Sequence, residues 1–351
     1  MQLVKNNIKT LDIEKRFYNL KEQGFFNSAS LSIKIKNTPQ INIEYISEEV
    51  VNPLFPIMSI SKPLTASILW RYYIKGYLKW SDPIIKFWPE FGRKGKDKTT
   101  IKQILSHTAG IPYHNTLNEK DYADWGRISE WIEDLEPEYK PGERIQYHSL
   151  TYGWVIGEII NRISGKSFEE VFDEEVAKPL NLRDTMFVIP DKKIKNILPL
   201  QAGENFEDLL LIEQISDIQK YKIILPAASA VSTSKDICKF FSSLSLNNNT
   251  EEWLPKKFVS SLCLSHAEGI DIFGKYHRMG LGIMLPTGIN NKYGAPRNNK
   301  TIGHGGMGIA TAWKDIDNEI SVAFLTTTIQ PEKLKEEIHS QFFKNIRACI
   351  S

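Results

Sequence analysis

Alternating apolar and polar residues stand near both ends of the chain, and this feature constrains the fold more than any other. The alternation is clear in segments 29–36 and 41–46, and the later strand candidates are 308–314 and 319–327. A period of two indicates β-strands, and the short turns Asn37-Thr38-Pro39 and Asp315-Ile316-Asp317-Asn318 separate the segments of each pair. Two β-hairpins are therefore predicted, joined in one antiparallel sheet that both chain ends build.

The chain between the hairpins has a different character. Apolar residues at helical spacing, broken by Pro and Gly, predict several helices in it. We expect a fold of the α/β (α+β) class, with an antiparallel sheet flanked by helices and an inserted, mainly helical lobe. The expected domains are a discontinuous α/β sandwich from residues 1–80 and 222–351 and a helical lobe from residues 81–221. The polar stretch 191–222 is predicted to cross the surface, and 279–285 to be one more strand.

Composition excludes several classes of function. A net charge of +2 over 351 residues gives no reason to expect a nucleic-acid partner. No apolar run approaches the length of a membrane span, and the first residues lack the apolar core of a signal peptide, so a cytoplasmic location without membrane contact is expected. Cys238, Cys263 and Cys349 form no Cys-x-x-Cys pair, which fits a reducing compartment and no thiolate metal site. The oligomeric state stays open.

Ser59 and Lys62 stand three residues apart where an apolar, proline-rich approach enters a buried helix. On a helix this spacing places both side chains on one face. A serine hydroxyl needs a neighbouring base to become a nucleophile, and a lysine can serve when burial lowers its pKa. The alternative is a serine that caps the helix beside a solvated lysine, which is the commoner arrangement for Ser-x-x-Lys alone.

Tyr147 and Ser149 follow a Pro-Gly turn, and two residues apart in extended backbone they point the same way. A tyrosine near a lysine can act as general base and then as general acid. The alternative is a half-buried tyrosine at a helix start.

The segment Gly303-His304-Gly305-Gly306-Met307-Gly308 opens the late hairpin. Its glycines would let a ligand lie against a strand edge and pair with the backbone there. His304 could donate to a substrate carboxylate. The segment lacks the strand-to-helix context of a phosphate loop, so nucleotide binding is not expected.

These three elements, in this order and at these spacings, resemble the serine β-lactamase and penicillin-recognising family. The similarity is greatest to its class C-like branch, which includes esterases, D-amino-acid peptidases and transacylases. The segments 105–112 and 227–236 also resemble connectors of that family, so the resemblance spans about residues 25–345. It implies a β-lactamase-like fold.

The resemblance also implies a role for each matching residue. Ser59 would be the acylated nucleophile, Lys62 its activating partner, and Tyr147 the general base and proton shuttle. The backbone N–H groups of Ser59 and Met307 would form the oxyanion hole. Ser149, His304, Gly305 and Gly306 would contact the substrate. No cofactor or metal is implied.

Two departures bear on the substrate. Ser149 stands where many relatives carry asparagine, and His304 replaces the lysine of a Lys-Thr-Gly form. The second change exchanges a fixed positive charge for a titratable one. We therefore expect a hydrolase of small ester or amide substrates, including peptides. The alternatives are a β-lactamase or D-peptide hydrolase, an acyltransferase, and a binding protein without activity. The loops 113–125 and 290–300 are expected to set water access and acceptor binding.

Overall fold

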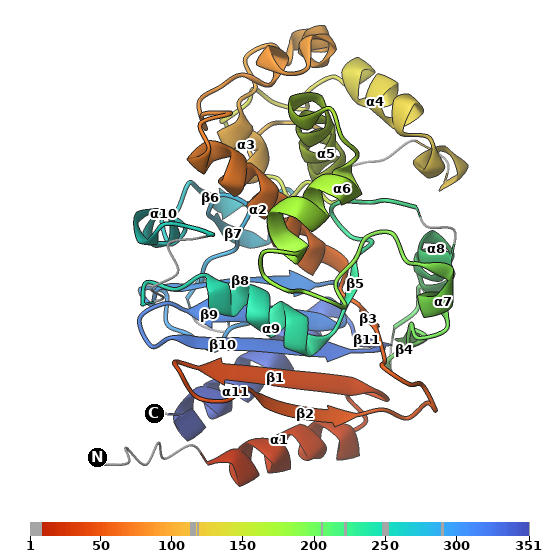
Figure 1. Ribbon diagram of the computed structural model, residues 1–351, viewed down its shortest axis with the longest axis vertical. Helices are drawn as coiled ribbons and strands as arrows, with labels where there is room; N and C mark the ends of the chain where they lie inside the picture. Colours follow the sequence, from red (N-terminus) through yellow and green to blue (C-terminus); the bar gives the residue numbers. More distant parts are fainter. Residues whose placement is uncertain are drawn as a thin grey trace.

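A five-stranded antiparallel sheet forms the lower half of the molecule in the computed structural model (Figure 1). The structure describes residues 9–112, 117, 119–204, 206–220, 223–247, 253–288 and 291–350. The strand order is β2-β1-β10-β9-β8. The bounds are β1 Ala29–Ile35, β2 Ile41–Tyr45, β8 Thr301–Gly306, β9 Ala310–Asp315 and β10 Ile320–Thr326. Because β1 pairs with β10, the predicted sheet built from both chain ends is confirmed.

Helices cover both faces of this sheet. Phe324 on β10 packs with α1 (Thr10–Glu22) and α11 (Glu332–Ile350), whereas its neighbours Ala323 and Leu325 belong to the core on the opposite face, under α9 (Ser234–Ser243). Successive strand residues point to opposite faces, so one strand serves two apolar cores. β8 lies at the edge of the five-stranded sheet, and on its outer side the backbone of Gly303 pairs with that of Met284.

The other half of the molecule is helical. Its elements are α2 Ser61–Ile74, α3 Ile101–Leu105, α4 Trp125–Asp134, α5 Thr151–Ser164, α6 Phe168–Phe172, α7 Asp191–Ile194, α8 Leu209–Lys220 and α10 Lys256–Ser261. Buried residues on nearly every side of α2 make it the central helix, and it packs against α5. One apolar cluster runs from these helices to the upper face of the sheet. The division at residues 80 and 222 stays a prediction.

Short elements connect the two halves. They are β3 Phe55–Pro56, the 3-10 turn Met58–Ile60, β4 Gln201–Ala202, β5 Val231–Ser232, β6 Ala267–Ile270, β7 Tyr276–Met279 and β11 Thr328–Ile329. The prediction of a strand over 279–285 was wrong, because β7 already ends at Met279. Gly282 has a φ of +79°, which interrupts extended backbone there.

The stretch 191–222 was also expected to be a polar excursion, yet it contains α8. Ile215 of α8 is buried in the main core and Leu211 packs against it, so this helix covers apolar surface. In the described part of the chain, no helix is long and apolar enough to cross a membrane.

Candidate active site

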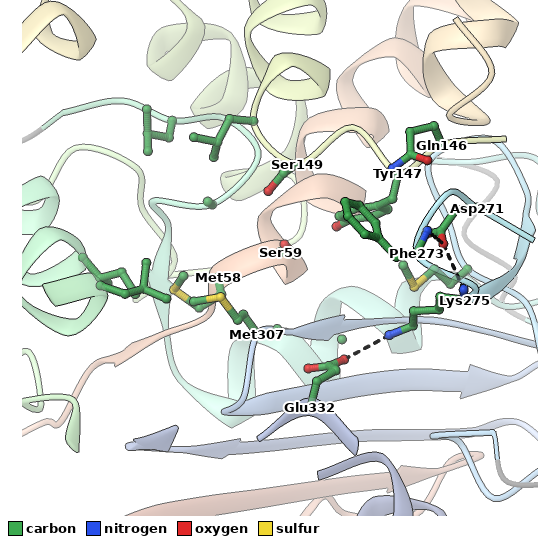
Figure 2. Close-up of a pocket in the computed structure, with 18 of the residues that line it drawn as sticks. Met58, Ser59, Gln146, Tyr147, Ser149, Asp271, Phe273, Lys275, Met307 and Glu332 are labelled. Carbon is green, nitrogen blue, oxygen red and sulfur yellow. Dashed lines mark hydrogen bonds and ion pairs between the residues drawn. The ribbon is translucent and has the colours of Figure 1, made fainter. Parts of the chain in front are cut away.

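A cavity of about 1130 Å³ lies between the helical half and the edge of the sheet, and Ser59 is on its wall (Figure 2). Five of the predicted site residues join Ser59 in lining it, namely Tyr147, Ser149, Gly305, Gly306 and Met307. A cavity of this size accommodates a small-molecule ligand. The fold therefore brings together groups that lie up to 248 positions apart in the sequence.

Ser59 sits in the tight 3-10 turn that precedes α2, as the sequence predicted. Met58 and Ile60 on either side are buried and anchor the turn in the core. Met58 has a φ of +48°, a left-handed conformation that costs a non-glycine residue of order 1–3 kcal/mol. Such strain persists only where packing fixes the backbone, so the position of the serine is tightly determined.

Lys62 lies within hydrogen-bond distance of this serine. Its side chain is 1% exposed, and its Nζ donates to Ser59 Oγ at 3.1 Å and to the Ala227 carbonyl at 3.3 Å. Burial lowers the pKa of Lys62 to about 7. A large share of the molecules therefore carry a neutral amine there at neutral pH, and such an amine can accept the serine proton.

Tyr147 lies beside the end of the Lys62 side chain. Its ring centroid is 4.8 Å from Lys62 Nζ, and its ring stacks on that of His107 with 4.6 Å between centroids. His107 Nδ1 accepts a hydrogen bond from the backbone N–H of His148 at 3.0 Å, so His107 has a structural role. Burial holds the pKa of His107 well below its usual range, which leaves a neutral ring against Tyr147.

The edge strand β8 approaches the serine turn closely. A Cβ built on Gly306 would lie 2.6 Å from the Ile57 carbonyl oxygen, so only glycine fits this contact. The backbone N–H groups of Ser59 and Met307 donate to no backbone carbonyl within the described ranges. Two backbone donors on adjoining segments are suited to an oxyanion.

His304 does not reach the cavity wall. It is 2% exposed, its Nδ1 lies 2.8 Å from the Gly305 carbonyl, and its ring centroid is 6.3 Å from that of Tyr147. Burial keeps the pKa of His304 well below its usual range. The ring is therefore neutral at neutral pH, and a direct substrate contact for it stays a prediction.

Titratable residues that the sequence did not name as site residues line the wall beyond Tyr147, although Lys292 lies in the loop 290–300 that was expected to set acceptor binding. These are Asp271, Lys275, His277, Lys292, Glu332 and Lys335. Asp271 bonds His277 Nε2 at 2.6 Å, and Lys275 lies within 3.5 Å of Glu332. They come from the β6–β7 hairpin, the loop before β8 and the start of α11, and no short motif links them.

The opposite wall of the cavity is mainly apolar. Its apolar members are Met58, Leu117, Leu150, Leu211, Ile215, Leu225 and Met307, while Asp121, which pairs with Arg127, and Gln214 of α8 also line the cavity. Figure 2 shows Met58 and Met307 on one side of Ser59, and Tyr147, Asp271 and Lys275 on the other. Ser59 thus stands between an apolar half and a charged half of one cavity. Of the loops expected to set access, residues 113–116, 118 and 290 lie outside the described part of the chain.

Comparison with known proteins identifies the family. The sequence model of the family described as Beta-lactamase matches residues 50–341. This chain belongs to that family. LipL of Mycobacterium tuberculosis, described as an esterase/beta-lactamase, is 21% identical over 307 residues, which cover 77% of this chain and 68% of LipL.

Two further comparisons concern coverage and fold. A β-lactamase of Escherichia coli is 29% identical over 144 residues, 41% of this chain and 37% of that protein, so this chain matches well under two thirds of that relative. The solved structure of a penicillin-binding protein homologue from Caulobacter crescentus has a TM-score of 0.84 at 19% identity and covers 99% of both chains. The predicted β-lactamase-like fold is confirmed.

The described residues contain no group of three or more His, Cys, Asp or Glu side chains that could hold a metal ion.

Proposed function

We propose that this member of the β-lactamase family is a serine hydrolase that cleaves ester or amide bonds of small acyl or peptide substrates. The observation that carries the proposal is the hydrogen bond of 3.1 Å between Lys62 Nζ and Ser59 Oγ. It joins a cavity-lining hydroxyl to an amine whose pKa burial lowers to about 7. That pair meets the requirement of a nucleophile with an adjacent base.

Acylation follows from this arrangement. Neutral Lys62 takes the proton of Ser59 Oγ as the oxygen attacks the substrate carbonyl carbon. The negative charge that develops on the carbonyl oxygen is held by the backbone N–H groups of Ser59 and Met307. Tyr147 then delivers its phenolic proton to the departing oxygen or nitrogen and regains a proton from the protonated Lys62, and an ester between Ser59 and the acyl group remains.

Deacylation repeats these roles with water. The proton carriers Tyr147 and Lys62 remove a proton from the water as it attacks the ester carbon, and Ser59 Oγ leaves with a proton. An alcohol or amine in place of water would give acyl transfer on the same residues. The apolar half of the cavity supports an acyl group with little polarity.

Intact-mass spectrometry after exposure to a fluorophosphonate tests the nucleophile. We expect a single adduct that maps to Ser59 and is absent from Ser59→Ala. A penicillin in a second sample tests the β-lactam alternative, and an adduct there would extend the substrate class to β-lactams. Folded protein that forms no adduct with either reagent would contradict the proposal in favour of a binding protein without activity.

A cytoplasmic location is the second part of the proposal. Cys238, Cys263 and Cys349 are free, and Cys238 and Cys349 are buried. Free cysteines are typical of reducing compartments. Fractionation of the source cells with an antibody to this chain tests the location, and recovery outside the cytoplasm would contradict it.

A further inference from the structure

Three lysines gather on the cavity wall beyond Tyr147, but they differ in what they bind. Lys335 Nζ donates to Glu332 at 2.7 Å and to the Gly306 carbonyl at 3.0 Å. Lys275 Nζ lies 3.5 Å from Glu332 and 3.0 Å from Glu336. These two ammonium groups are therefore neutralised by carboxylates of α11.

Lys292 has no such partner. Within the described ranges no carboxylate lies within 4.0 Å of its Nζ, and its one hydrogen bond goes to Met284 Sδ at 3.1 Å. A thioether is a weak acceptor, so the donors of this ammonium are poorly used. Glu332 and Glu336 act on this cation only from beyond hydrogen-bond distance, so it is partly desolvated without a directly bonded counter-ion, and an incoming anion would reduce that cost.

The position of Lys292 is equally informative. A Cβ built on Gly305 would lie 3.1 Å from Lys292 Nζ, so the ammonium stands directly beside the backbone of the edge strand β8. Lys292 and Gly305 both line the cavity. A molecule held against β8 would therefore meet this charge.

The two halves of the cavity receive different parts of a substrate. A proton donor must be within hydrogen-bond reach of the leaving atom, so the leaving group lies on the Tyr147 side of Ser59. The charged wall is on that side, and the apolar wall with Met58 is on the other (Figure 2). The acyl group accordingly faces the apolar wall, and the leaving group faces Lys292.

We propose that Lys292 determines specificity by binding a carboxylate carried on the leaving group of the substrate. This inference rests on the proposed function and names the substrate class of the same site: an ester or amide that joins an apolar acyl group to an acidic alcohol or amine. Lys292 acts by binding and takes no part in proton transfer.

The charge of Lys292 depends on its surroundings. Burial lowers the pKa of Lys292 to about 8, so the side chain is mostly charged at pH 7. The titratable groups that face it from the packed elements are Lys275, His277, His304, Glu332, Lys335, Glu336 and His339. Burial alone would raise the pKa of Glu332, but the nearby lysines outweigh it and lower that pKa, so Glu332 stays ionised and bound to them.

Two esters with one acyl group test the inference. The butanoyl ester of 3-hydroxybenzoate carries a carboxylate on its leaving group, and the butanoyl ester of 3-hydroxybenzamide is neutral and nearly the same shape. We expect the ratio of kcat/KM for the anionic ester to that for the neutral ester to exceed about 10 at pH 7, the scale of a charge-assisted hydrogen bond. The ratio should fall as the pH rises through about 8.

Three variants assign that ratio to one side chain. Lys292→Met should reduce it at least ~10-fold and abolish its pH dependence, whereas Lys292→Arg should keep most of it. The matched control is Lys300→Met, since Lys300 pairs with Asp317 at 3.0 Å on the surface and does not line the cavity. Its ratio should equal that of the wild type, and a thermal melt of each variant confirms folding.

Binding to Ser59→Ala provides a readout without turnover. Calorimetry should show tighter binding of the anionic ester to Ser59→Ala than to the double variant Ser59→Ala/Lys292→Met. Equal affinity for both esters, or an anion preference that survives Lys292→Met, would overturn the inference. Hydrolysis of neither ester by the wild type would count against the proposed function alone, and the calorimetry would still decide the role of Lys292.

Discussion

Gly306 of β8 lies so close to Ile57 that a Cβ on the glycine would come within 2.6 Å of the Ile57 carbonyl oxygen. Ile57 directly precedes the turn that carries Ser59, and Met307 directly follows Gly306. This one backbone contact therefore sets the separation between the two N–H groups assigned to the oxyanion hole.

Gly306→Ala should damage catalysis more than folding. The added methyl group must push β8 away from the serine turn, because the obstructing atom belongs to the backbone. We expect kcat/KM for an activated ester to fall ~100-fold, as when one oxyanion donor is lost, and the free energy of unfolding to fall by about 1–3 kcal/mol.

Gly305→Ala, assayed on a neutral ester that does not use the charge of Lys292, is the comparison for a methyl group added one residue earlier on β8. Its Cβ would meet the end of the flexible Lys292 side chain at 3.1 Å, so a small movement relieves the contact. A loss of kcat/KM in Gly305→Ala as large as in Gly306→Ala would contradict the role given to the Gly306–Ile57 contact.

The pH dependence of acylation should report Lys62. Because burial lowers the pKa of Lys62 to about 7, the amine that accepts the Ser59 proton forms as the pH rises through that value. We expect kcat/KM for a neutral ester to increase about tenfold per pH unit below 7 and to level off above it. A stopped-flow profile between pH 5 and 9 checks this, and a flat profile would remove Lys62 from the first proton transfer.

The same burial predicts a stability effect. Above pH 10.5 Lys62 is neutral in both folded and unfolded chains, whereas below about 7 it is charged in both. Between these values only the unfolded chain binds the proton, so the destabilisation grows as the pH falls and is complete below about 7. A pKa difference of this size corresponds to at most about 5 kcal/mol.

Lys62→Met removes this cost. We expect the substitution to raise the free energy of unfolding by a few kcal/mol more at pH 6 than at pH 9.5. Urea denaturation at both pH values measures the difference. An identical effect of the substitution at both values would contradict a lowered pKa for Lys62.

The proximity of Ser59 and Lys62 was predictable from the sequence because it depends on a short motif. Ser59 and Lys62 need only one helical turn to meet, and their hydrogen bond is observed. Tyr147 and Ser149 both line the cavity, as their spacing suggested. The sheet was equally predictable. Strands were expected near both chain ends, and β1 pairs with β10 in the structure.

The walls of the cavity were not predictable in the same way. Lys292 lies in the loop 290–300 that was expected to set acceptor binding, but no motif in that loop indicates that this lysine stands beside Gly305. Ile215 lies in a stretch that was interpreted as a polar excursion, although its helix covers the cavity. Both depend on contacts between segments far apart in sequence, which local periodicity does not encode.

The α8 face gives the last prediction. Leu211 and Ile215, one helical turn apart, line the apolar half of the cavity, whereas Leu209 on the same helix is 63% exposed and does not line it. Ile215→Trp should shorten the space for the acyl group. We expect kcat/KM for an octanoyl ester to fall ~10-fold relative to that for a butanoyl ester, the scale of overpacking by 1–3 kcal/mol.

Leu211→Trp should act in the same direction and serves if Ile215→Trp folds poorly. Leu209→Trp, which adds the same ring on the exposed side, should leave the ratio of the two esters unchanged. If all three variants gave the wild-type ratio, the acyl group would have to lie elsewhere than on α8.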